Sequence, residues 1–433
     1  GLGRLAIYYT SKSGTPGTTD SNALKYYDLT LASTPDPEVP SPTGIIRTLV
    51  GLTDISLESG VDTGDGRDGD VVVKYNTNIN RTNLISGRTC TDGGDAVNYN
   101  ILSFNSAGTE ATLNRAPSTG CLASGDEVLI INLQGTYSAF GNVGNYETLR
   151  ILNINNTTIR FTTAKTRYYG NNLNDDTNLG VGAQTQRVML QRVPNYENLT
   201  INSGVTFYPD AWATETTEDA TYRVSKGGVI FFRASGSVSI SGTLSATGKG
   251  YRGGTQDGGY DYGGGQGGEA FCGVGGNGAT AGGVGSTGAS GGGGASNNGG
   301  AGYCGGGGGG LTGGVGSVNV GGAGGGGGRY SGGGGGGYGT PGAGGNRQLD
   351  MYGADGGTNR SGDGGSDVSA RAGGGGGGSY GTEDLSRAIF GAGGGRGGNQ
   401  TSPMQGGAGG SGGGIVGVYG NSITVSGSLQ SNG

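Results

Sequence analysis

The sequence contains one group of closely spaced carboxylates on a glycine-rich turn, Asp65-Gly66-Arg67-Asp68-Gly69-Asp70. Carboxylate oxygens are hard ligands of the kind that Ca²⁺ binds in proteins. The spacing differs from that of an EF-hand loop, and Arg67 places a positive charge in the middle. Asp65, Asp68 and Asp70 are therefore a weak calcium candidate, with a solvated acidic turn as the alternative. No other cofactor or metal is expected.

The four cysteines form two separated pairs, Cys90 with Cys121 and Cys272 with Cys304. Zinc is a poor interpretation because the chain has no histidine and no closely spaced cysteines. An even count in an acidic chain of exported character favours disulfides. Local pairing, 90 to 121 and 272 to 304, is favoured over the other two connectivities and over free thiols. Each such loop would be worth about 3–4 kcal/mol in the chain-entropy account.

The absence of histidine also removes the commonest general base and the Ser-His and Cys-His nucleophile pairs. No spacing singles out a pair of carboxylates of the kind that glycoside hydrolases use. The sequence therefore predicts no catalytic residue and a protein that is not an enzyme.

Charge and hydropathy exclude two further classes of partner. The formal net charge is -6, whereas nucleic acids and anionic membranes are bound by a concentrated basic face. No run of 18 apolar residues is present, so no membrane span is expected. The chain begins at Gly1 without a basic or apolar leader, which we interpret as a mature chain whose leader has been removed, with an expressed fragment as the alternative.

The elements that position these residues are predicted to be all-β. Residues 1–60 form an N-terminal β arm followed by a Pro-rich linker with Pro35, Pro37, Pro40 and Pro42. The arm carries Leu5, Ile7 and Tyr9, which we predict to be subunit contacts, added as a strand to a neighbouring copy. The alternative is a hairpin packed on its own chain. Residues 61–195 are short β-branched runs between Gly, Asn and Asp turns, typical of a β-sandwich or barrel.

An internal repeat brackets a glycine-rich stretch. The segment 227–248 is echoed without gaps by 412–433, including Val238-Ser239-Ile240-Ser241-Gly242 against Ile423-Thr424-Val425-Ser426-Gly427. Alternating residues with a glycine corner are typical of β-solenoid coils. We predict solenoid-like layers at 196–249 and 415–433. Because the second copy resembles the first, the insert should return to the layer that it left.

The insert itself, 250–414, contains six-glycine runs at 305–310, 332–337 and 373–378. Such a composition is unsuited to helices and ordinary strands. Disorder is one interpretation, and the other, which the flanking repeats favour, is a bundle of polyglycine-II helices bonded through their backbones. Its tyrosines are candidate receptor contacts, with coverage of bundle faces or subunit contacts as the alternative. They are Tyr303, Tyr330, Tyr338, Tyr352 and Tyr380.

This glycine-rich block between short β elements resembles the polyglycine-II sandwich of the adhesins at the tips of phage long tail fibres. Residues 62–260 are similar to bacterial glycine-rich surface proteins, in Gly64-Asp65-Gly66, in the stretch 121–135, in Gln191-Arg192-Val193-Pro194-Asn195-Tyr196 and in Gly248-Lys249-Gly250-Tyr251-Arg252-Gly253-Gly254. The resemblance implies an extracellular or cell-surface structural role and brings no catalytic residues with it. In the phage adhesins, loops at the end of the bundle bind a host receptor.

These observations predict a non-catalytic structural subunit of an extracellular filament or cell-surface assembly. The subunit would polymerise by donating its N-terminal β arm to a neighbouring copy, so its partners would be copies of itself. The alternative is a cell-surface or phage-tip adhesin that binds a receptor or glycan through loops of the bundle.

Overall fold

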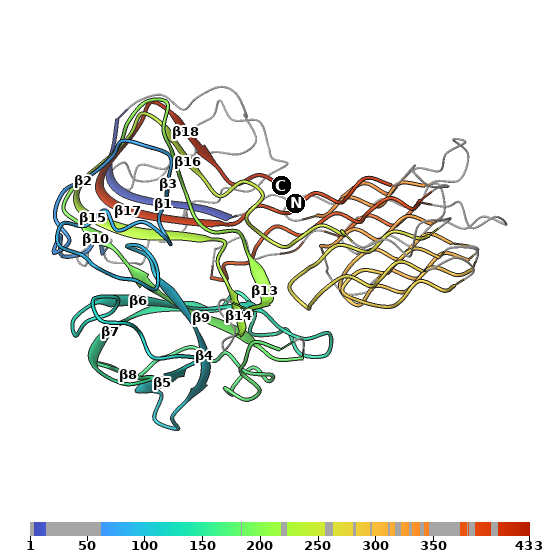
Figure 1. The fold of residues 1–433 in the computed structure, drawn as a ribbon, viewed down its shortest axis with the longest axis horizontal. Helices are drawn as coiled ribbons and strands as arrows, with labels where there is room; N and C mark the ends of the chain where they lie inside the picture. The colour runs from blue at the N-terminus through green and yellow to red at the C-terminus, as the bar shows by residue number, and fades with distance from the viewer. Residues whose placement is uncertain are drawn as a thin grey trace, which may run out of the picture.

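The computed structural model describes residues 4–13, 62–182, 184–217, 223–255, 263–279, 283–294, 297–310, 312–316, 322–328, 331–337, 342–345, 373–378, 380, 386–399 and 406–433. Every helix or strand assigned among them is a β-strand. Figure 1 shows three parts: curved parallel sheets, a barrel beneath them, and a flat lattice of extended segments to one side.

The barrel is closed by six antiparallel strands in the order β4, β5, β8, β7, β6, β9. The strands are β4 (Asn98–Phe104), β5 (Glu110–Leu113), β6 (Glu127–Gln134), β7 (Tyr146–Asn155), β8 (Thr158–Phe161) and β9 (Arg187–Val193). Every residue of β6 and β9 is buried. In β6, Val128 and Ile130 belong to the barrel core, whereas Leu129 and Ile131 belong to a second core outside it. The two-residue period of the strand thus fills two cores at once.

Two parallel sheets lie above the barrel. The first has the order β1 (Arg4–Ser13), β17 (Ile415–Val425), β15 (Val229–Ile240), β11 (Leu199–Ile201), β2 (Val71–Val73), with β10 (Asn195–Tyr196) also paired to β15. The second has the order β18 (Ser428–Gln430), β16 (Thr243–Ser245), β12 (Thr206–Tyr208), β3 (Thr77–Asn78). β2 and β3, which the sequence placed with the barrel, therefore belong to these sheets. A separate hairpin joins β13 (Ala213–Thr217) to β14 (Arg223–Lys226).

The two copies of the internal repeat lie side by side. β15 pairs with β17 in the register Val238 to Ile423 and Ile240 to Val425, and β16 pairs with β18 in the register Leu244 to Leu429. Their corner glycines stack, because a Cβ on Gly427 would overlap the carbonyl oxygen of Gly242. The glycine-rich insert leaves after β16 and returns at β17, the strand beside β15, as the repeat predicted.

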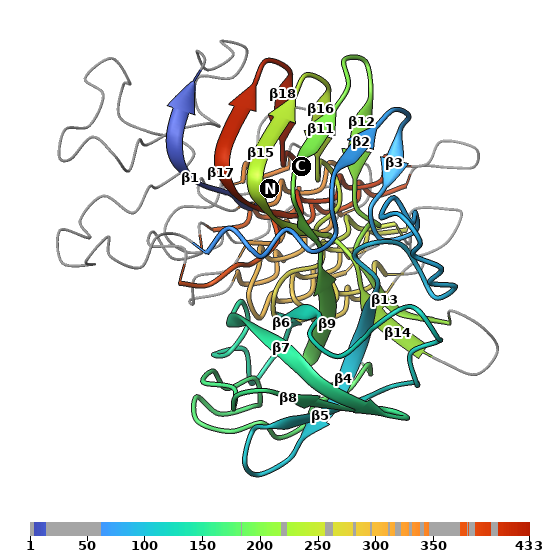
Figure 2. The same ribbon diagram turned by 90° about the vertical axis from the view of Figure 1, so that its left-hand side faces the viewer.

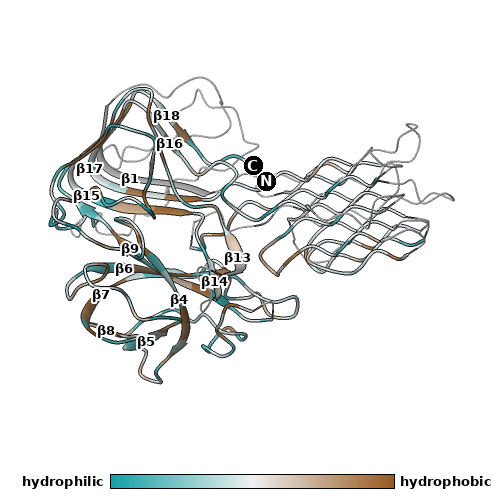
Figure 3. Cartoon of the chain, viewed as in Figure 1, coloured by the Kyte–Doolittle hydropathy of each residue, from teal (hydrophilic) through white to brown (hydrophobic). Residues whose placement is uncertain are grey.

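The insert is a lattice of extended segments that are joined by backbone hydrogen bonds. Figure 3 shows it as nearly uniform in intermediate hydropathy, unlike the apolar strands of the sheets. Gly324 and Gly327 donate to Gly393 and Arg396 of one segment, while Gly325, between them, donates to Gly375 of another. This segment therefore meets the same neighbour at every third residue. At Gly324, Gly325 and Gly327 a neighbouring backbone leaves no room for a Cβ, so glycine is required at these positions.

Disulfides join Cys90 to Cys121 at the barrel core and Cys272 to Cys304 in the glycine-rich lattice. No free cysteine is present among the described residues. Disulfides of this kind are typical of an oxidising, extracellular environment.

Candidate functional site: the sheet edge at β1 and the joint beneath it

β1 is the outermost strand of the first sheet. It runs parallel to β17, with Leu5 in register with Val416, Ile7 with Val418 and Tyr9 with Gly420. Figure 2 shows β1 at one side of the sheet and β2 near the other. The structure thus pairs the N-terminal strand with its own chain. The pairing is a single parallel strand rather than a hairpin, and the predicted contact of Leu5, Ile7 and Tyr9 with a neighbouring copy stays a prediction.

The edge of β17 that pairs with β1 is held in place by packing on both faces of the strand. Val416 and Val418 of β17 lie in the same core cluster as Ile230 and Phe232 of β15. On the other face of β17, Tyr419 packs its ring 5.1 Å from that of Phe231. β17 is therefore anchored on both faces, which leaves its backbone positioned to pair with one further strand.

The covalent connection does not tie β1 closely to its sheet. Three strands separate β1 from β2, which is about 20 Å at ~4.8 Å per strand. Residues 14–70 join them, and a fully extended chain of that length would span roughly 190 Å at ~3.3 Å per residue. The connection is thus several times longer than pairing within one chain requires.

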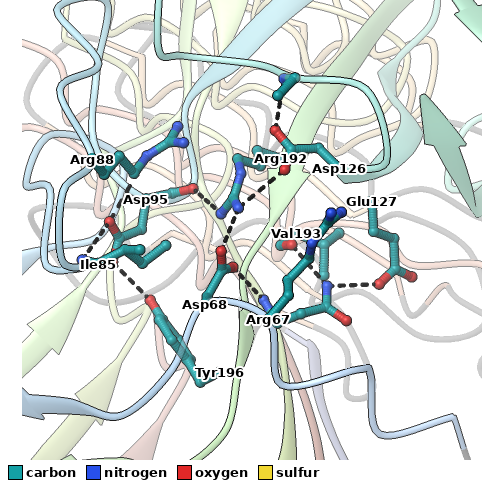
Figure 4. Close-up of polar contacts among 12 residues, drawn as sticks. Arg67, Asp68, Ile85, Arg88, Asp95, Asp126, Glu127, Arg192, Val193 and Tyr196 are labelled. Carbon is teal, nitrogen blue, oxygen red and sulfur yellow. Dashed lines mark hydrogen bonds and ion pairs between the residues drawn. The ribbon is translucent and has the colours of Figure 1, made fainter. Parts of the chain in front are cut away.

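Beneath the sheet, a buried network of charges joins it to the barrel (Figure 4). Arg192 of β9 donates from Nη2 to Asp68 at 2.6 Å and to Asp126 at 3.2 Å, and all three side chains are less than a tenth exposed. Burial alone would lower the pKa of Arg192, but the bonds to Asp68 and Asp126 outweigh it and raise that pKa above its ordinary value. The guanidinium is therefore fixed as a cation.

A second ion pair in the same joint reaches β17. Arg233 of β15 donates from Nε to both oxygens of Glu127 in β6, at 2.9 and 3.0 Å. Asn195 donates to the same carboxylate at 2.9 Å. The Arg233 guanidinium also lies 4.6 Å from the centre of the Tyr419 ring, a cation–π distance. Barrel, sheet and acceptor strand are thereby held together at one point.

Asp95 completes the network. Its carboxylate accepts hydrogen bonds from the backbone N–H groups of Leu84 and Ile85 and from the Tyr196 hydroxyl. Burial raises the pKa of Asp95 in spite of these bonds. Burial also raises the pKa of Tyr196, as does the neighbouring Asp95 charge. The hydroxyl therefore stays protonated and serves as a donor.

The calcium candidates point to different partners in the structure. Asp68 accepts from Arg192 and from the Asn195 backbone, Asp65 accepts from Arg150 at 3.0 Å, and Asp70 accepts from Asn198 at 2.8 Å. In the part of the chain that the structure describes, no group of three or more His, Cys, Asp or Glu residues could hold a metal ion.

Two of the candidate receptor tyrosines lie among the described residues. Tyr303 is 44% exposed and stacks on Tyr137, which is 48% exposed, with ring centres 4.9 Å apart. Tyr380 is buried, donates its hydroxyl to the Phe390 carbonyl and packs on the Phe271 ring. The prediction that Tyr380 contacts a receptor is therefore wrong, because its ring fills a core. Tyr330, Tyr338 and Tyr352 lie outside the described residues.

Among the described residues, no helix is long and apolar enough to cross a membrane.

Comparison with known proteins gives only distant likenesses. No protein-family model and no curated protein matches the chain. The tailspike of Pseudomonas phage phi297 matches at 15% identity and a TM-score of 0.15, over 41% of this chain and 24% of that one. The tailspike of Acinetobacter baumannii bacteriophage AP22, in complex with A. baumannii capsular saccharide, matches at 12% identity and a TM-score of 0.16, over 40% and 29%. The matches thus span about a quarter of each tailspike, and the likeness is weak and partial.

The prediction that the protein is not an enzyme is wrong in its reasoning, because the absence of histidine does not exclude an enzyme that acts on saccharides. Chemistry on saccharides commonly relies on two carboxylates and does not require histidine. A chain with 32 Asp and Glu residues is therefore not excluded from it by the absence of histidine.

Proposed function

We propose that the chain is a structural subunit of an extracellular filament or cell-surface assembly in which β1 of one copy pairs with β17 of the next. The observation that carries this proposal is the position of β1 as a lone N-terminal edge strand on a long connection. The β17 edge that accepts β1 of its own chain has the same chemistry in every copy. Exchange therefore creates the same backbone hydrogen bonds between copies that it removes within one.

Such an exchange links each copy to two others. Each copy donates a strand at one point and accepts a strand at another, which is a head-to-tail contact. Unless the rotation between copies closes a ring, this contact extends into a fibre. A long connection also lowers the effective concentration of β1 at its own edge, which favours partners when subunits are crowded.

The proposal assigns polyglycine-II geometry to the lattice, as a rigid body carried by each subunit. This helix has three residues per turn, whereas facing residues in a β-strand recur every two. Support comes from the three-residue period of the hydrogen bonds. It also comes from the segment 406–412, where an added Cβ would overlap a neighbouring carbonyl oxygen at Gly406, Gly409 and Gly412 and meets nothing within 4 Å at Gly407 and Gly410.

Cysteine cross-linking tests the exchange, using Ser11 and Ser422, which are paired in register. One preparation carries Ser11→Cys and a second carries Ser422→Cys, and the two are assembled together under oxidising conditions. A disulfide-linked pair on a non-reducing gel is expected, because the two cysteines can meet only between copies. Each variant assembled alone is the control and should give no such pair.

A double variant, Ser11→Cys with Ser422→Cys, separates the outcomes further. Pairing between copies should give a ladder of linked subunits, and removal of residues 1–13 should abolish fibres in negative-stain micrographs. If the double variant links only within single chains and the mixed preparation stays unlinked, β1 serves its own subunit and the proposal is wrong.

A second candidate function, binding of a receptor or glycan, is favoured by the exposed pair Tyr137 and Tyr303 at the border of barrel and lattice. Exposed aromatic rings are frequent anchors of binding surfaces.

For this function we expect Tyr303→Ala to weaken binding to the target cells or their surface glycans by about tenfold or more, the loss typical of an anchor residue. Tyr75→Ala is the matched control, because Tyr75 is 80% exposed and belongs to the parallel-sheet region. Equal binding by the two variants would remove the Tyr303 surface from consideration.

A further inference from the structure

The sequence contains six Asn-X-Ser/Thr sequons, the acceptor motif for N-linked glycans in exported proteins. They begin at Asn80, Asn155, Asn156, Asn198, Asn359 and Asn399. In a chain this rich in Asn, Ser and Thr the motif arises often by chance. Burial and hydrogen bonding decide which of the asparagine amides is accessible.

In three of the sequons the asparagine side chain is buried or hydrogen-bonded within the fold. Asn80 is 4% exposed and donates from Nδ2 to the Ala96 carbonyl at 2.8 Å. Asn399 is 0% exposed and accepts from the Gly406 backbone. Asn198 donates from Nδ2 to Asp70 and accepts from Ser237, which ties two turns together. A glycan on Nδ2 would disturb the bonds that Asn80 and Asn198 donate, and the complete burial of Asn399 leaves no room for one. Asn359 lies outside the described residues.

The remaining two sequons overlap in the turn of the β7–β8 hairpin. Asn155 and Thr158 form the last pair of the ladder, and Asn156 and Thr157 make the turn between them. Asn156 has a φ of 53°, a left-handed conformation that asparagine tolerates well. Asn155 and Asn156 are exposed, as are Leu152 and Asn153 before them, so this end of the hairpin projects from the barrel on both faces.

The turn of the hairpin also lies away from the β1 edge, the buried joint and the lattice. Figures 1 and 2 both place β8, the strand that follows the turn, on the side of the barrel away from the parallel sheets, and Figure 1 separates it from the lattice. A large substituent at this turn would leave the β1 edge, the buried joint and the backbone hydrogen bonds of the lattice undisturbed.

We propose that this turn is an N-glycosylation site and that Asn156 is its acceptor. Asn156 is chosen over Asn155 because it lies outside the ladder. A bond forms between Asn156 Nδ2 and the anomeric carbon of a sugar carried on a phosphate- or diphosphate-linked lipid. The bond from that carbon to the phosphate oxygen breaks, the phosphate leaves with the electron pair, and Nδ2 loses one proton. The site requires export, which the two disulfides indicate.

Trypsin separates the sequons cleanly, which makes mass spectrometry of the protein from its native source decisive. Cleavage after Arg150 and Arg160 releases 151–160 with both candidate asparagines, whereas Asn80 lies in 75–81 and Asn399 in 397–433. We expect 151–160 to carry a mass increment made of whole sugar residues, with sugar fragment ions, and 75–81 and 397–433 to be unmodified.

Two threonine variants made in the native host identify the acceptor. Thr158→Val removes the sequon of Asn156 alone and should abolish the modification of 151–160. Thr157→Val removes only the sequon of Asn155 and should leave the modification in place. An unmodified 151–160 in the native protein would overturn the proposal, and so would loss of the sugar in Thr157→Val with retention in Thr158→Val. Sugar on 75–81 would refute the argument from burial.

Discussion

Gly409→Ala is expected to disrupt the glycine-rich lattice, whereas Gly410→Ala, one residue along the same segment, is expected to be tolerated. A Cβ on Gly409 would overlap the Gly394 carbonyl oxygen, but a Cβ on Gly410 meets no heavy atom within 4 Å. The overlapped group is backbone and cannot rotate away, so the segment itself must move. Overpacking costs about 1–3 kcal/mol in ordinary cores, and we expect at least the upper end here.

Thermal unfolding and limited proteolysis of the lattice measure this difference. The two variants have identical composition and lie in the same segment, so intrinsic propensity cancels between them. The pattern should repeat at Gly406 and Gly407, where only the first lacks room for a Cβ. Equal stability of Gly409→Ala and Gly410→Ala would be incompatible with a lattice whose segments turn once every three residues.

Arg192→Met is expected to destabilise the joint between barrel and sheet by about 3–5 kcal/mol. The substitution keeps much of the apolar stem but leaves Asp68 and Asp126 without their shared cation in a buried site, which is the costly way to break an ion pair. Chemical denaturation at neutral pH gives the free energy of unfolding.

Arg160→Met supplies the control for this experiment. Arg160 and Glu110 form an ion pair at 3.7 Å whose side chains are 53% and 36% exposed, and solvent screening limits such a pair to about 0–1 kcal/mol. If Arg192→Met costs no more than Arg160→Met, the buried network does not hold barrel and sheet together.

The pairing of the two copies of the internal repeat could be predicted from sequence, because it follows from local repetition. Val238 to Ile240 and Ile423 to Val425 have the same alternation and the same distance to a corner glycine, so parallel pairing in register buries both alike. The position of β2 could not be predicted, because Val71 to Val73 is too short a run to choose between barrel and sheet. The partner of β1 is likewise a tertiary choice, since the apolar residues at 5–9 fit any open edge.

The buried joint could not be derived from spacing, because its partners lie far apart in the sequence. Arg192 and Asp68 are 124 residues apart, and Arg233 and Glu127 are 106 apart. One signal was present: each arginine follows apolar strand residues, in Val188-Met189-Leu190-Gln191-Arg192 and Val229-Ile230-Phe231-Phe232-Arg233. A charge within a buried strand requires a partner. For Tyr380 the sequence contains no such signal, because a tyrosine beside glycine runs is equally compatible with a surface and with a core.

The glycine-rich insert begins after β16 and ends at β17, and its two ends meet in the hydrogen bonds from Gly250 to Gly412 and from Gly414 to Ala246. The insert therefore acts as a closed loop, and the pairing of the strands in the sheets does not depend on its length. The insert can gain, lose or exchange whole segments while β15 and β17 remain adjacent. We therefore expect the sequence of the insert to diverge faster among related proteins than that of the sheet edge. The insert could also be replaced by another protein domain.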